Sequence, residues 1–248
     1  MRFSIITATM NSGETLSETM DSLKNQTFKN FEQVIVDSCS IDNTHQIIND
    51  YRGFYKIVFK EDERLGVYSA LNTGMKVALG EFIGVLHSDD VYNDHNVLDM
   101  LDEFILKNTP DVLWGDISYV SRTKKSKVIR TWKSGESTKT KIKNGWMPPH
   151  VSVFIRREII KKYSLEYLSK YKISSDYDFL LNLLLKNDIK KSYISKEIIK
   201  MKYGGISNKN IKNIKLKMYE DFQILRSHNI SPIRGLLLKN ARKIHQFF

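Results

Sequence analysis

The sequence predicts an α/β fold with a mostly parallel central sheet, flanking helices and a C-terminal helical extension. Two observations lead to this expectation. Short apolar runs rich in β-branched residues alternate with segments of helical periodicity, and polar loops follow the first runs. Because strands that alternate with helices pair in parallel, the N-terminal part should build a parallel sheet. With 248 residues, the chain is long enough to bury one sizeable core.

Four strands and three helices are expected in the N-terminal part. The strands are predicted from short apolar runs at residues 3–7, 33–36, 56–59 and 82–86. The helices between them are predicted from apolar residues at helical spacing, at residues 16–23, 44–51 and 67–79. Gly80 follows the last of these helices and is expected to end it as a left-handed C′ residue.

The alternation is less regular in the C-terminal part. A helix is expected after Asn96 from its apolar spacing. Further strands are expected at residues 112–114, near Tyr119 and Val128, and at residues 151–155. Helices are expected at residues 176–185 and 210–226, and the tail after Pro232 could form one more.

Charge is divided unevenly along the chain. The total of +11 combines residues 1–120, with 9 Lys and Arg against 19 Asp and Glu, and residues 121–248, with 30 against 9. The basic half implies an anionic partner, which could be a nucleic acid, a phospholipid surface or a pyrophosphate-bearing substrate. A Lys-rich solvated face would give the same count, so charge alone leaves all four explanations open.

The composition favours a cytoplasmic protein. No run approaches the ~18 apolar residues that span a bilayer, and the N-terminal residues lack the pattern of a secretory signal. Cys39 is the only cysteine, which excludes an intramolecular disulfide and fits a reducing compartment.

Polar residues follow three of the predicted strands, at 9–11, 37–42 and 88–90. In an open parallel sheet, ligands bind beyond the carboxyl ends of the strands, so these loops should meet at one rim. Asp89 and Asp90 place two adjacent carboxylates there, which suits a Mg²⁺ or Mn²⁺ ion that also binds substrate phosphate. Helix capping is the alternative for such a pair.

Asp37 ends the second strand, where its carboxylate could accept hydrogen bonds from a base or a ribose. Capping of a turn or helix is the alternative for Asp37 and the better explanation for Asp42. No glycine-rich phosphate loop follows the first or the second predicted strand, which disfavours a Rossmann dehydrogenase or a P-loop enzyme.

Six stretches resemble family 2 glycosyltransferases in order and spacing. The N-terminal three are FSIITATMN, EQVIVDSCSIDNT and GVYSALNTGMKVALGEFIGVLHSDD. The C-terminal three, as in bacterial members that build surface polysaccharides, are PPHVSVFIRREII, YKISSDYDFLLNLLLK and YGGISNKN. The resemblance implies a GT-A fold and inverting transfer from a nucleotide-diphosphate sugar, with UDP as the expected nucleotide and Mn²⁺ or Mg²⁺ as cofactor. The implied acceptor is a saccharide or a lipid-linked saccharide.

The resemblance also implies roles for individual residues on the donor side. Thr9 and Asp37 match residues that hold the nucleoside, and Asn11, in the same loop as Thr9, is grouped with them. Asp89 matches the acid near the ribose. Asp90 matches the acid that binds the metal.

On the acceptor side, Asp176 matches the catalytic base. A base is also needed on chemical grounds, because the sugar hydroxyl must lose a proton as it attacks the anomeric carbon. Asp178, two residues later, is expected to cap or support the helix that begins there.

Three further residues are secondary candidates. Arg64 stands where relatives often have an acidic residue and could pair with the donor diphosphate, or be a solvated loop residue. His150 could act near the metal or the acceptor, and a structural hydrogen bond is its alternative. Trp146 could stack on a sugar face, and core packing is its alternative.

Two other classes of protein remain as alternatives. A metal-dependent nucleotidyltransferase would also use acids at strand ends, but the basic glycine-rich loop that it usually needs after the first strand is absent. A nucleic-acid-binding module would explain the basic half, but no motif of aromatic residues interleaved with Lys and Arg is present. We therefore expect no nucleic-acid partner.

The expected organisation is a catalytic domain at residues 1–205 and a basic helical extension at 206–248. Residues 1–95 would form the nucleotide- and metal-binding half of the domain, and residues 96–205 the acceptor half. The extension could lie on an anionic membrane surface, which would make the protein peripheral to the membrane, or it could dock on the domain.

Overall fold

The computed structural model describes residues 1–63, 65–122, 127–204 and 211–244. Its strands are β1 (Phe3–Thr9), β2 (Phe31–Asp37), β3 (Lys56–Glu61), β4 (Phe82–Val85), β5 (Val91–Tyr92), β6 (Val112–Val120), β7 (Val128–Trp132), β8 (Val153–Arg156) and β9 (Lys191–Lys202). Its helices are α1 (Leu16–Lys24), α2 (Thr44–Tyr51), α3 (Val67–Val77), α4 (Val97–Asn108), α5 (Lys139–Lys143), α6 (Arg157–Lys162), α7 (Ser175–Leu184), α8 (Ile211–Ser227) and α9 (Pro232–Ile244), with a short 3₁₀ turn, η1 (His150–Ser152).

Within the described residues, all strands join one sheet in the order β3-β2-β1-β4-β8-β6-β9-β5, with β7 paired to the free part of β6. The pairings of β1 with β2 and β4, and of β2 with β3, are parallel, as expected from the sequence. Beyond β4 the sheet becomes mixed, because β8 runs antiparallel to β4 and β6. The expected α/β fold is therefore confirmed, with its parallel part at the N-terminal end.

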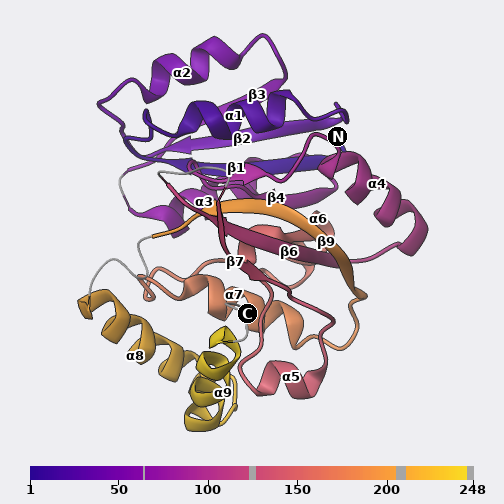
Figure 1. Cartoon of the computed structure of the whole chain (residues 1–248), viewed down its shortest axis with the longest axis vertical. Coiled ribbons are helices and arrows are strands. Elements are labelled where there is room, and N and C mark those ends of the chain that lie inside the picture. The colour runs from indigo at the N-terminus through magenta and orange to yellow at the C-terminus, as the bar shows by residue number, and fades with distance from the viewer. Residues whose placement is uncertain (64, 123–126, 205–210, 245–248) are drawn as a thin grey trace.

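Both faces of the sheet are covered by helices (Figure 1). On one face, α3, α5, α6 and α7 pack around the largest core cluster, in which Trp114 and Tyr177 are fully enclosed. On the other face, α1 and α2 pack on β2, and α4 packs across β6 and β8. The strand ends and the loops that follow them are therefore the parts of the sheet that remain open to a ligand.

The expectation for Gly80 was wrong. Helix α3 ends at Val77 because Ala78 is already extended, and Gly80 is not left-handed. The reason for a glycine is a close approach, since a Cβ at residue 80 would lie 2.4 Å from the backbone nitrogen of Ser4. Four further elements, β5, β9, α5 and α6, were not predicted from the sequence.

The C-terminal extension is docked on the domain by α8 and α9. Lys239 of α9 is buried, and its Nζ donates to Oδ2 of Asp221 in α8 at 2.8 Å. The backbone of Gly235 lies so close to Gly145 that a Cβ at residue 145 would be 2.3 Å from its carbonyl oxygen. Arg242 donates to the carbonyl of Asn144. The docking alternative is therefore what the structure shows for α9.

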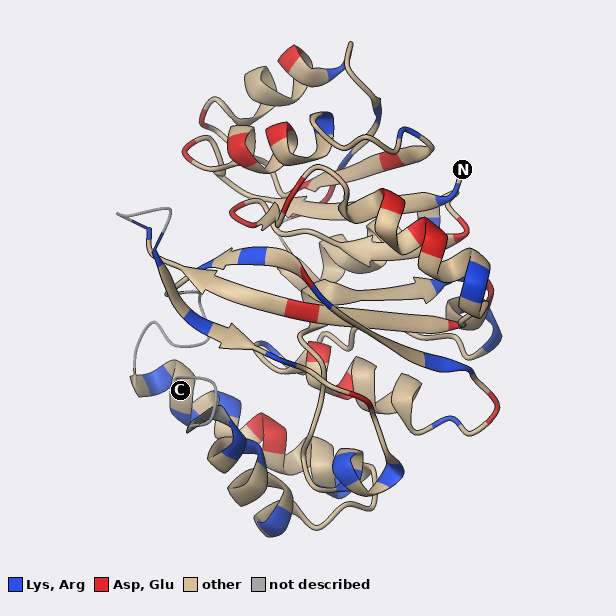
Figure 2. Ribbon diagram, turned by 45° about the vertical axis from the view of Figure 1, so that its right-hand side comes forward, with Lys and Arg blue, Asp and Glu red and all other residues tan. Residues whose placement is uncertain are grey.

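The two charge types separate in space as they do along the chain. Figure 2 shows Lys and Arg concentrated on α8, α9 and the segments near them, and Asp and Glu more frequent on the N-terminal helices and loops. No helix among the described residues is long and apolar enough to cross a membrane.

The buried pair of Lys239 and Asp221 generates a stability prediction. Lys239→Met should lower the free energy of unfolding by about 3–5 kcal/mol, because it leaves the Asp221 carboxylate buried without its cation. Arg234→Met, on an exposed position of the same helix, should change it by no more than about 0.5 kcal/mol. Urea unfolding of the two variants and the wild type measures the difference, and equal stabilities for the variants would contradict the docking of α9.

Candidate active site at the carboxyl ends of the parallel strands

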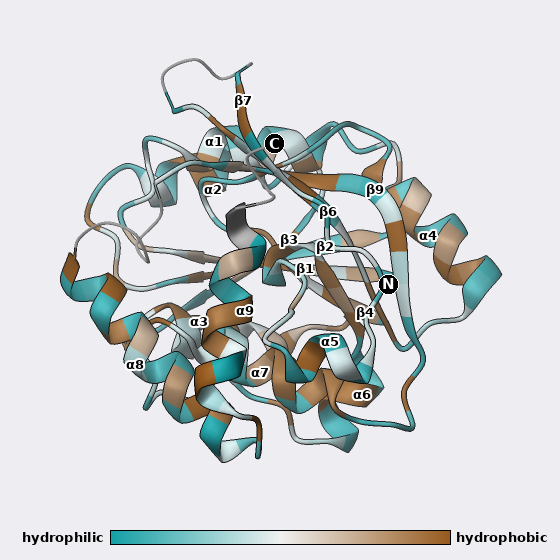
Figure 3. Ribbon diagram, turned by 60° about the horizontal axis from the view of Figure 1, so that its bottom comes forward, coloured by the Kyte–Doolittle hydropathy of each residue, from teal (hydrophilic) through white to brown (hydrophobic). Residues whose placement is uncertain are grey.

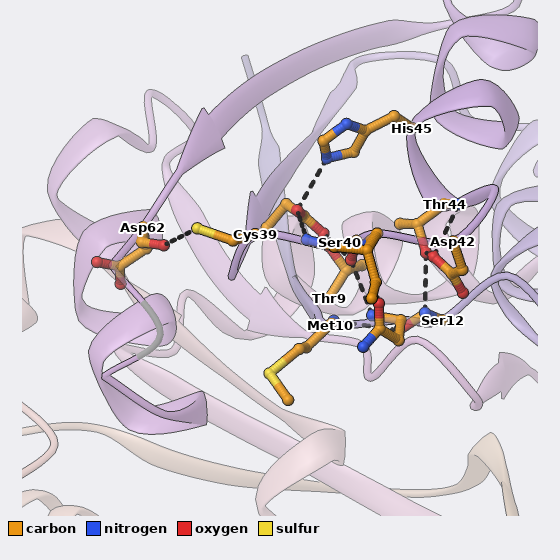
Figure 4. A network of polar contacts seen from close by, with 12 residues as sticks. Thr9, Met10, Ser12, Cys39, Ser40, Asp42, Thr44, His45 and Asp62 are labelled. Atoms are coloured by element: carbon orange, nitrogen blue, oxygen red, sulfur yellow. Dashed lines mark hydrogen bonds and ion pairs between the residues drawn. The ribbon is translucent and has the colours of Figure 1, made fainter.

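The loops after β1 and β2 are joined by hydrogen bonds (Figure 4). The backbone N–H of Asn11 donates to Oγ of Ser40 at 2.8 Å, and the Asn11 side-chain oxygen accepts the N–H of Ile41 at 2.9 Å. The N–H of Ser12 donates to Oγ1 of Thr44 at 2.8 Å. Asn11 adopts a left-handed backbone conformation, with φ of 51°, that allows these contacts. The two strand ends thus form one polar shelf.

The loop after β4 joins the same shelf. Oγ of Ser12 contacts Oγ of Ser88 at 3.0 Å, directly before the two acids of the Ser-Asp-Asp run. The hydroxyl of Thr19, from α1, donates to the carbonyl of Asp90 at 2.8 Å. The three loops that the sequence placed at one rim are therefore in contact.

Asp37 is wholly buried at the centre of the shelf. Its carboxylate accepts hydrogen bonds from the hydroxyl of Thr9 at 2.8 Å, from the N–H and hydroxyl of Ser40, and from Nε2 of His45 at 2.9 Å. Burial by itself would raise the pKa of Asp37, but these hydrogen bonds, led by those from Ser40, lower it below the usual range. A carboxylate has about four acceptor positions, and these four hydrogen bonds occupy them. In this arrangement Asp37 and Thr9 therefore fix the conformation of the loop.

Asp89 and Asp90 differ in their surroundings. Asp89 is about one-third exposed, and its Oδ2 accepts from Nη2 of Arg122 at 2.9 Å. Asp90 is 1% exposed, and its Oδ2 has no hydrogen-bond partner among the described residues. Burial, and after it the negative charge of Asp89, raise the pKa of Asp90 well above its usual range. Among the described residues Asp90 forms no ion pair, and the charges of Arg122 and Lys202 oppose the rise in its pKa only in part.

These two carboxylates fit a divalent cation. The described residues contain no group of three or more His, Cys, Asp or Glu side chains that could hold a metal on their own. A site of one or two carboxylates, completed by substrate phosphates, is nevertheless the usual arrangement for Mg²⁺ with nucleotide substrates. The unsatisfied Oδ2 of Asp90 is the atom that such an ion would contact.

Two histidines connect this loop to Asp176 at the start of α7. His87 directly precedes Ser88, and its Nε2 lies 2.9 Å from Nε2 of His150 in η1. Nδ1 of His150 lies 3.3 Å from Oδ2 of Asp176. Enclosure by protein is the main cause that lowers the pKa of both histidines, that of His87 to about 4. The pair is therefore neutral at pH 7 and shares one hydrogen at its short contact.

Asp176 is positioned but still accessible, with 18% of its side chain exposed. Its Oδ1 accepts the N–H of Tyr177 at 2.9 Å and lies 3.4 Å from the hydroxyl of Tyr68 in α3. A mostly apolar pocket with Val85 and Tyr167 in its lining borders the side chains of Asp176 and His150. An accessible carboxylate fixed in this way can accept a proton from a bound hydroxyl.

The remaining candidates fall elsewhere. Trp146 is 7% exposed, donates to the carbonyl of Ser134 and packs edge-on against Trp114, so the structure assigns it to the core and not to a sugar-stacking face. Arg64 lies outside the described residues. Asp178 is buried, where it pairs with His228, the residue directly after α8, and supports its helix as expected.

The sequence analysis missed several residues of the site. Arg122 follows β6, yet it reaches Asp89 and the carbonyl of Tyr203 after β9. Tyr68 of α3 lies near Asp176 itself, and His87 reaches it through His150. Both lie inside the stretch GVYSALNTGMKVALGEFIGVLHSDD that resembles the family, and this was the only sequence signal for them.

Two solved glycosyltransferases share the fold of this chain. The fragment 1–349 of Staphylococcus aureus TarS in complex with UDP-GlcNAc matches with a TM-score of 0.71 at 24% identity, covering 91% of this chain and 67% of that one. The mannosyltransferase PcManGT from Pyrobaculum calidifontis, in complex with GDP-Man and Mn²⁺, matches with a TM-score of 0.67 at 15% identity, covering 97% and 69%. The chain spans 66% of the TarS fragment solved with UDP. These matches define the class: the fold is that of the GT-A glycosyltransferases.

The sequence model described as Glycosyl transferase family 2 matches residues 4–164. The chain therefore belongs to this family of glycosyltransferases. A glucosyltransferase of Escherichia coli, WfgD, is 27% identical over 216 residues, covering 86% of this chain and 82% of the relative. A PGL/p-HBAD biosynthesis glycosyltransferase of Mycobacterium tuberculosis is 27% identical over 210 residues, covering 83% and 79%. Neither alternative class from the sequence analysis gains support from these comparisons.

The hydrogen bonds of Asp37 generate a pH-dependent prediction. Asp37→Asn should lower the stability at pH 7 by about 1.5–3 kcal/mol, because an amide group would face the N–H of Ser40 and Nε2 of His45. The pKa of Asp37 is lower in the folded state than in the unfolded state, where it is near 3.8. The stabilisation by its hydrogen bonds is therefore fully present above the unfolded-state pKa and is lost as the pH falls through the folded-state pKa. Urea unfolding at pH 7 and near pH 3 should therefore show a stability gap that narrows in acid, and a gap that is constant with pH would contradict this account.

Proposed function

We propose that the protein transfers a sugar from a nucleotide-diphosphate sugar, with UDP as the expected nucleotide, to a hydroxyl of a saccharide or lipid-linked saccharide in cell-surface polysaccharide biosynthesis. The observation that supports this most is the chain of contacts from the Ser-Asp-Asp loop through His87 and His150 to Asp176. It puts a candidate base next to candidate metal and nucleotide ligands, as sugar transfer requires.

The relatives support the proposed substrates. TarS has been solved with UDP and with UDP-GlcNAc, and its name describes a poly(ribitol-phosphate) β-N-acetylglucosaminyltransferase. WfgD is named for transfer from UDP-Glc to a GlcNAc-diphosphoundecaprenol. A UDP-sugar donor and a phosphate-bearing surface glycan or glycolipid acceptor would also suit the basic half of this chain.

The proposed reaction is a single displacement. The acceptor oxygen forms a bond to the anomeric carbon on the face opposite the leaving group, the bond from that carbon to the diphosphate oxygen breaks, and its electron pair leaves with the diphosphate. Asp176 accepts the proton of the attacking hydroxyl. Because the acceptor displaces the diphosphate directly, the enzyme forms no covalent intermediate. Attack from the opposite face inverts the anomeric configuration.

The other residues of the site would bind and orient. Thr9, Asn11 and Asp37 would shape the nucleoside pocket, and Asp89 would face the ribose. Neutral His150 would hold the carboxylate of Asp176 in place, through the contact at 3.3 Å. Asp90 would hold a Mn²⁺ or Mg²⁺ ion, and when bound this ion would offset the negative charge of the diphosphate.

A donor screen tests the proposed function. The protein is incubated with UDP-, GDP- and dTDP-sugars and with diphosphate-linked saccharide acceptors, in Mn²⁺, in Mg²⁺ or in EDTA, and the released nucleoside diphosphate is measured. Release from one class of donor, dependent on acceptor and metal, is the expected result. A folded protein that binds none of the nucleoside diphosphates and releases none would contradict the proposal.

The role of Asp176 generates a kinetic prediction. Asp176→Asn should lower kcat by ~10²-fold or more, the scale expected when a general base is removed, while donor affinity is unchanged. The matched control is Asp178→Asn, which alters the pair with His228 inside the fold and should keep turnover in the protein that remains folded. Normal turnover in Asp176→Asn with an inactive, folded Asp178→Asn would move the base to Asp178.

We further propose that the protein works at the cytoplasmic face of the membrane and meets a lipid-linked acceptor there. The docked α9 leaves Ile233 and Leu237 exposed, but α8 carries the longer exposed apolar stripe. Its members, spaced three to four residues apart, are Ile211, Ile214, Met218 and Phe222. Figure 3 shows hydrophobic and hydrophilic residues alternating along α8. With Lys212 and other basic side chains on the helix, an anionic bilayer is the partner that complements both the apolar stripe and the charge.

Vesicle sedimentation tests the membrane proposal. The protein should co-sediment with phosphatidylglycerol-containing vesicles at low salt and weakly at high salt. Met218→Asp together with Phe222→Asp should reduce the bound fraction severalfold, whereas Leu106→Asp, at an exposed apolar position of α4, should not. The test uses substitutions in α8 because removal of α9 would leave Asp221 without its partner Lys239. Equal sedimentation of all variants would exclude α8 as the contact.

A further inference from the structure

One face of α8 is turned toward the domain, and Lys217 lies on it. Glu220, Asp221, Ile224 and Leu225 are the buried residues of this helix. Lys217 is three and four residues before Glu220 and Asp221, which is one helical turn. It therefore continues the inward face toward the N-terminal end of α8, where it is partly buried.

The inward face of α8 contacts the segment that leads into α7. The carboxylate of Glu220 accepts the backbone N–H groups of Lys172, Ile173 and Ser174 at 2.8, 2.9 and 2.9 Å. Asp176 follows two residues after Ser174. One turn of α8 thus holds the backbone that presents the proposed base, and the turn before it carries Lys217.

The charge of Lys217 is felt at the site. His150, whose pKa is lowered mainly by enclosure, is affected also by Asp176, which raises the pKa, and by Lys217, which lowers it. Lys217 likewise helps to lower the pKa of Asp221 and of Lys239. His150 contacts Asp176 at the N-terminal end of α7, and Asp221 and Lys239 belong to the docked extension. Lys217 thus acts on groups of both regions, as its place on the inward face of α8 requires.

The ammonium group of Lys217 is also unpaired within the part of the chain that the structure describes. Lys239, its basic neighbour, is paired with Asp221 at 2.8 Å. Lys217 has no hydrogen bond or ion pair with any residue that the structure describes. A cation that no protein carboxylate pairs with is available to an anionic ligand.

We propose that Lys217 binds a diphosphate in the active site. This inference rests on the proposed function, because sugar transfer brings a diphosphate close to the base. A lysine ammonium group binds phosphate as a point charge and needs no bidentate geometry. The diphosphate has two possible sources, the nucleotide of the donor and the lipid diphosphate of an acceptor.

In the donor case, Lys217 would act as the bond to the anomeric carbon breaks. The electron pair of that bond passes to a phosphate oxygen, and the proton of the acceptor hydroxyl passes to Asp176. Lys217 stays protonated and donates a hydrogen bond to the diphosphate as its charge grows. In the acceptor case, Lys217 would hold a diphosphate that takes no part in bond breaking and would set the position of the acceptor.

Calorimetric titration and steady-state kinetics test the inference. UDP is titrated in Mn²⁺ into the full chain carrying Lys217→Met, Lys217→Arg or Lys215→Met. Lys215 is the matched control because it is an exposed lysine two residues away on the same helix. We expect Lys217→Met to weaken UDP binding about tenfold or more, Lys217→Arg to retain most of it, and Lys215→Met to resemble the wild type.

Two results support the inference and one overturns it. Weaker UDP binding identifies the donor diphosphate as the ligand. Unchanged UDP binding with a KM for a diphosphate-linked acceptor that rises about tenfold identifies the acceptor diphosphate. If folded Lys217→Met matches Lys215→Met in both measurements while the wild type transfers sugar, Lys217 binds no phosphate. A wild type that neither binds a nucleoside diphosphate nor transfers sugar is a different result, which contradicts the proposed function itself.

Discussion

The parallel pairing of β1 with β2 on one side and with β4 on the other is the constraint on which the site depends. In the register of these strands Thr9 lies opposite Asp37, and the loop after β4 opens at the same edge. Because all three strands run in one direction, their carboxyl ends cannot be separated without breaking the sheet. Hydrogen bonds between the loops, such as those of Ser12 with Thr44 and Ser88, then fix a shelf that the strand order has already assembled.

The C-terminal extension acts on the other side of the site. The match to the family covers residues 4–164, so α7 and the two helices that follow it lie beyond that match. Yet α8 holds the backbone before Asp176 through Glu220, and α9 is anchored to α8 by the buried pair of Lys239 and Asp221. The extension therefore helps to position the candidate active site. The docking of α9 agrees with the alternative in which the extension packs on the domain.

The strand-end acids could be predicted from sequence because short apolar runs give the strands and the parallel topology gives their common edge. The position of Asp176 came only from resemblance to the family, since one acid at the start of a helix has many ordinary explanations. Strand β9 was missed because its run KSYISKEIIKMK carries charged residues throughout, which hides its buried residues Ile194, Ile198 and Ile199. Glu220 and Asp221 look like solvated helix residues in the sequence, and only tertiary packing shows that both are buried. The role of Trp146 could not be predicted from the sequence, because a tryptophan beside a loop can equally stack on a sugar or fill a core.

The central claim is that Asp90 completes a metal-dependent nucleotide site at this rim. The direct measurement is calorimetric titration of UDP, with and without Mn²⁺, into the wild type and into Asp90→Ala, with thermal unfolding to show that both are folded. The account predicts that Mn²⁺ strengthens UDP binding to the wild type by about tenfold or more, and that the folded variant loses this dependence on the metal. Equal, metal-dependent binding to both proteins would contradict it.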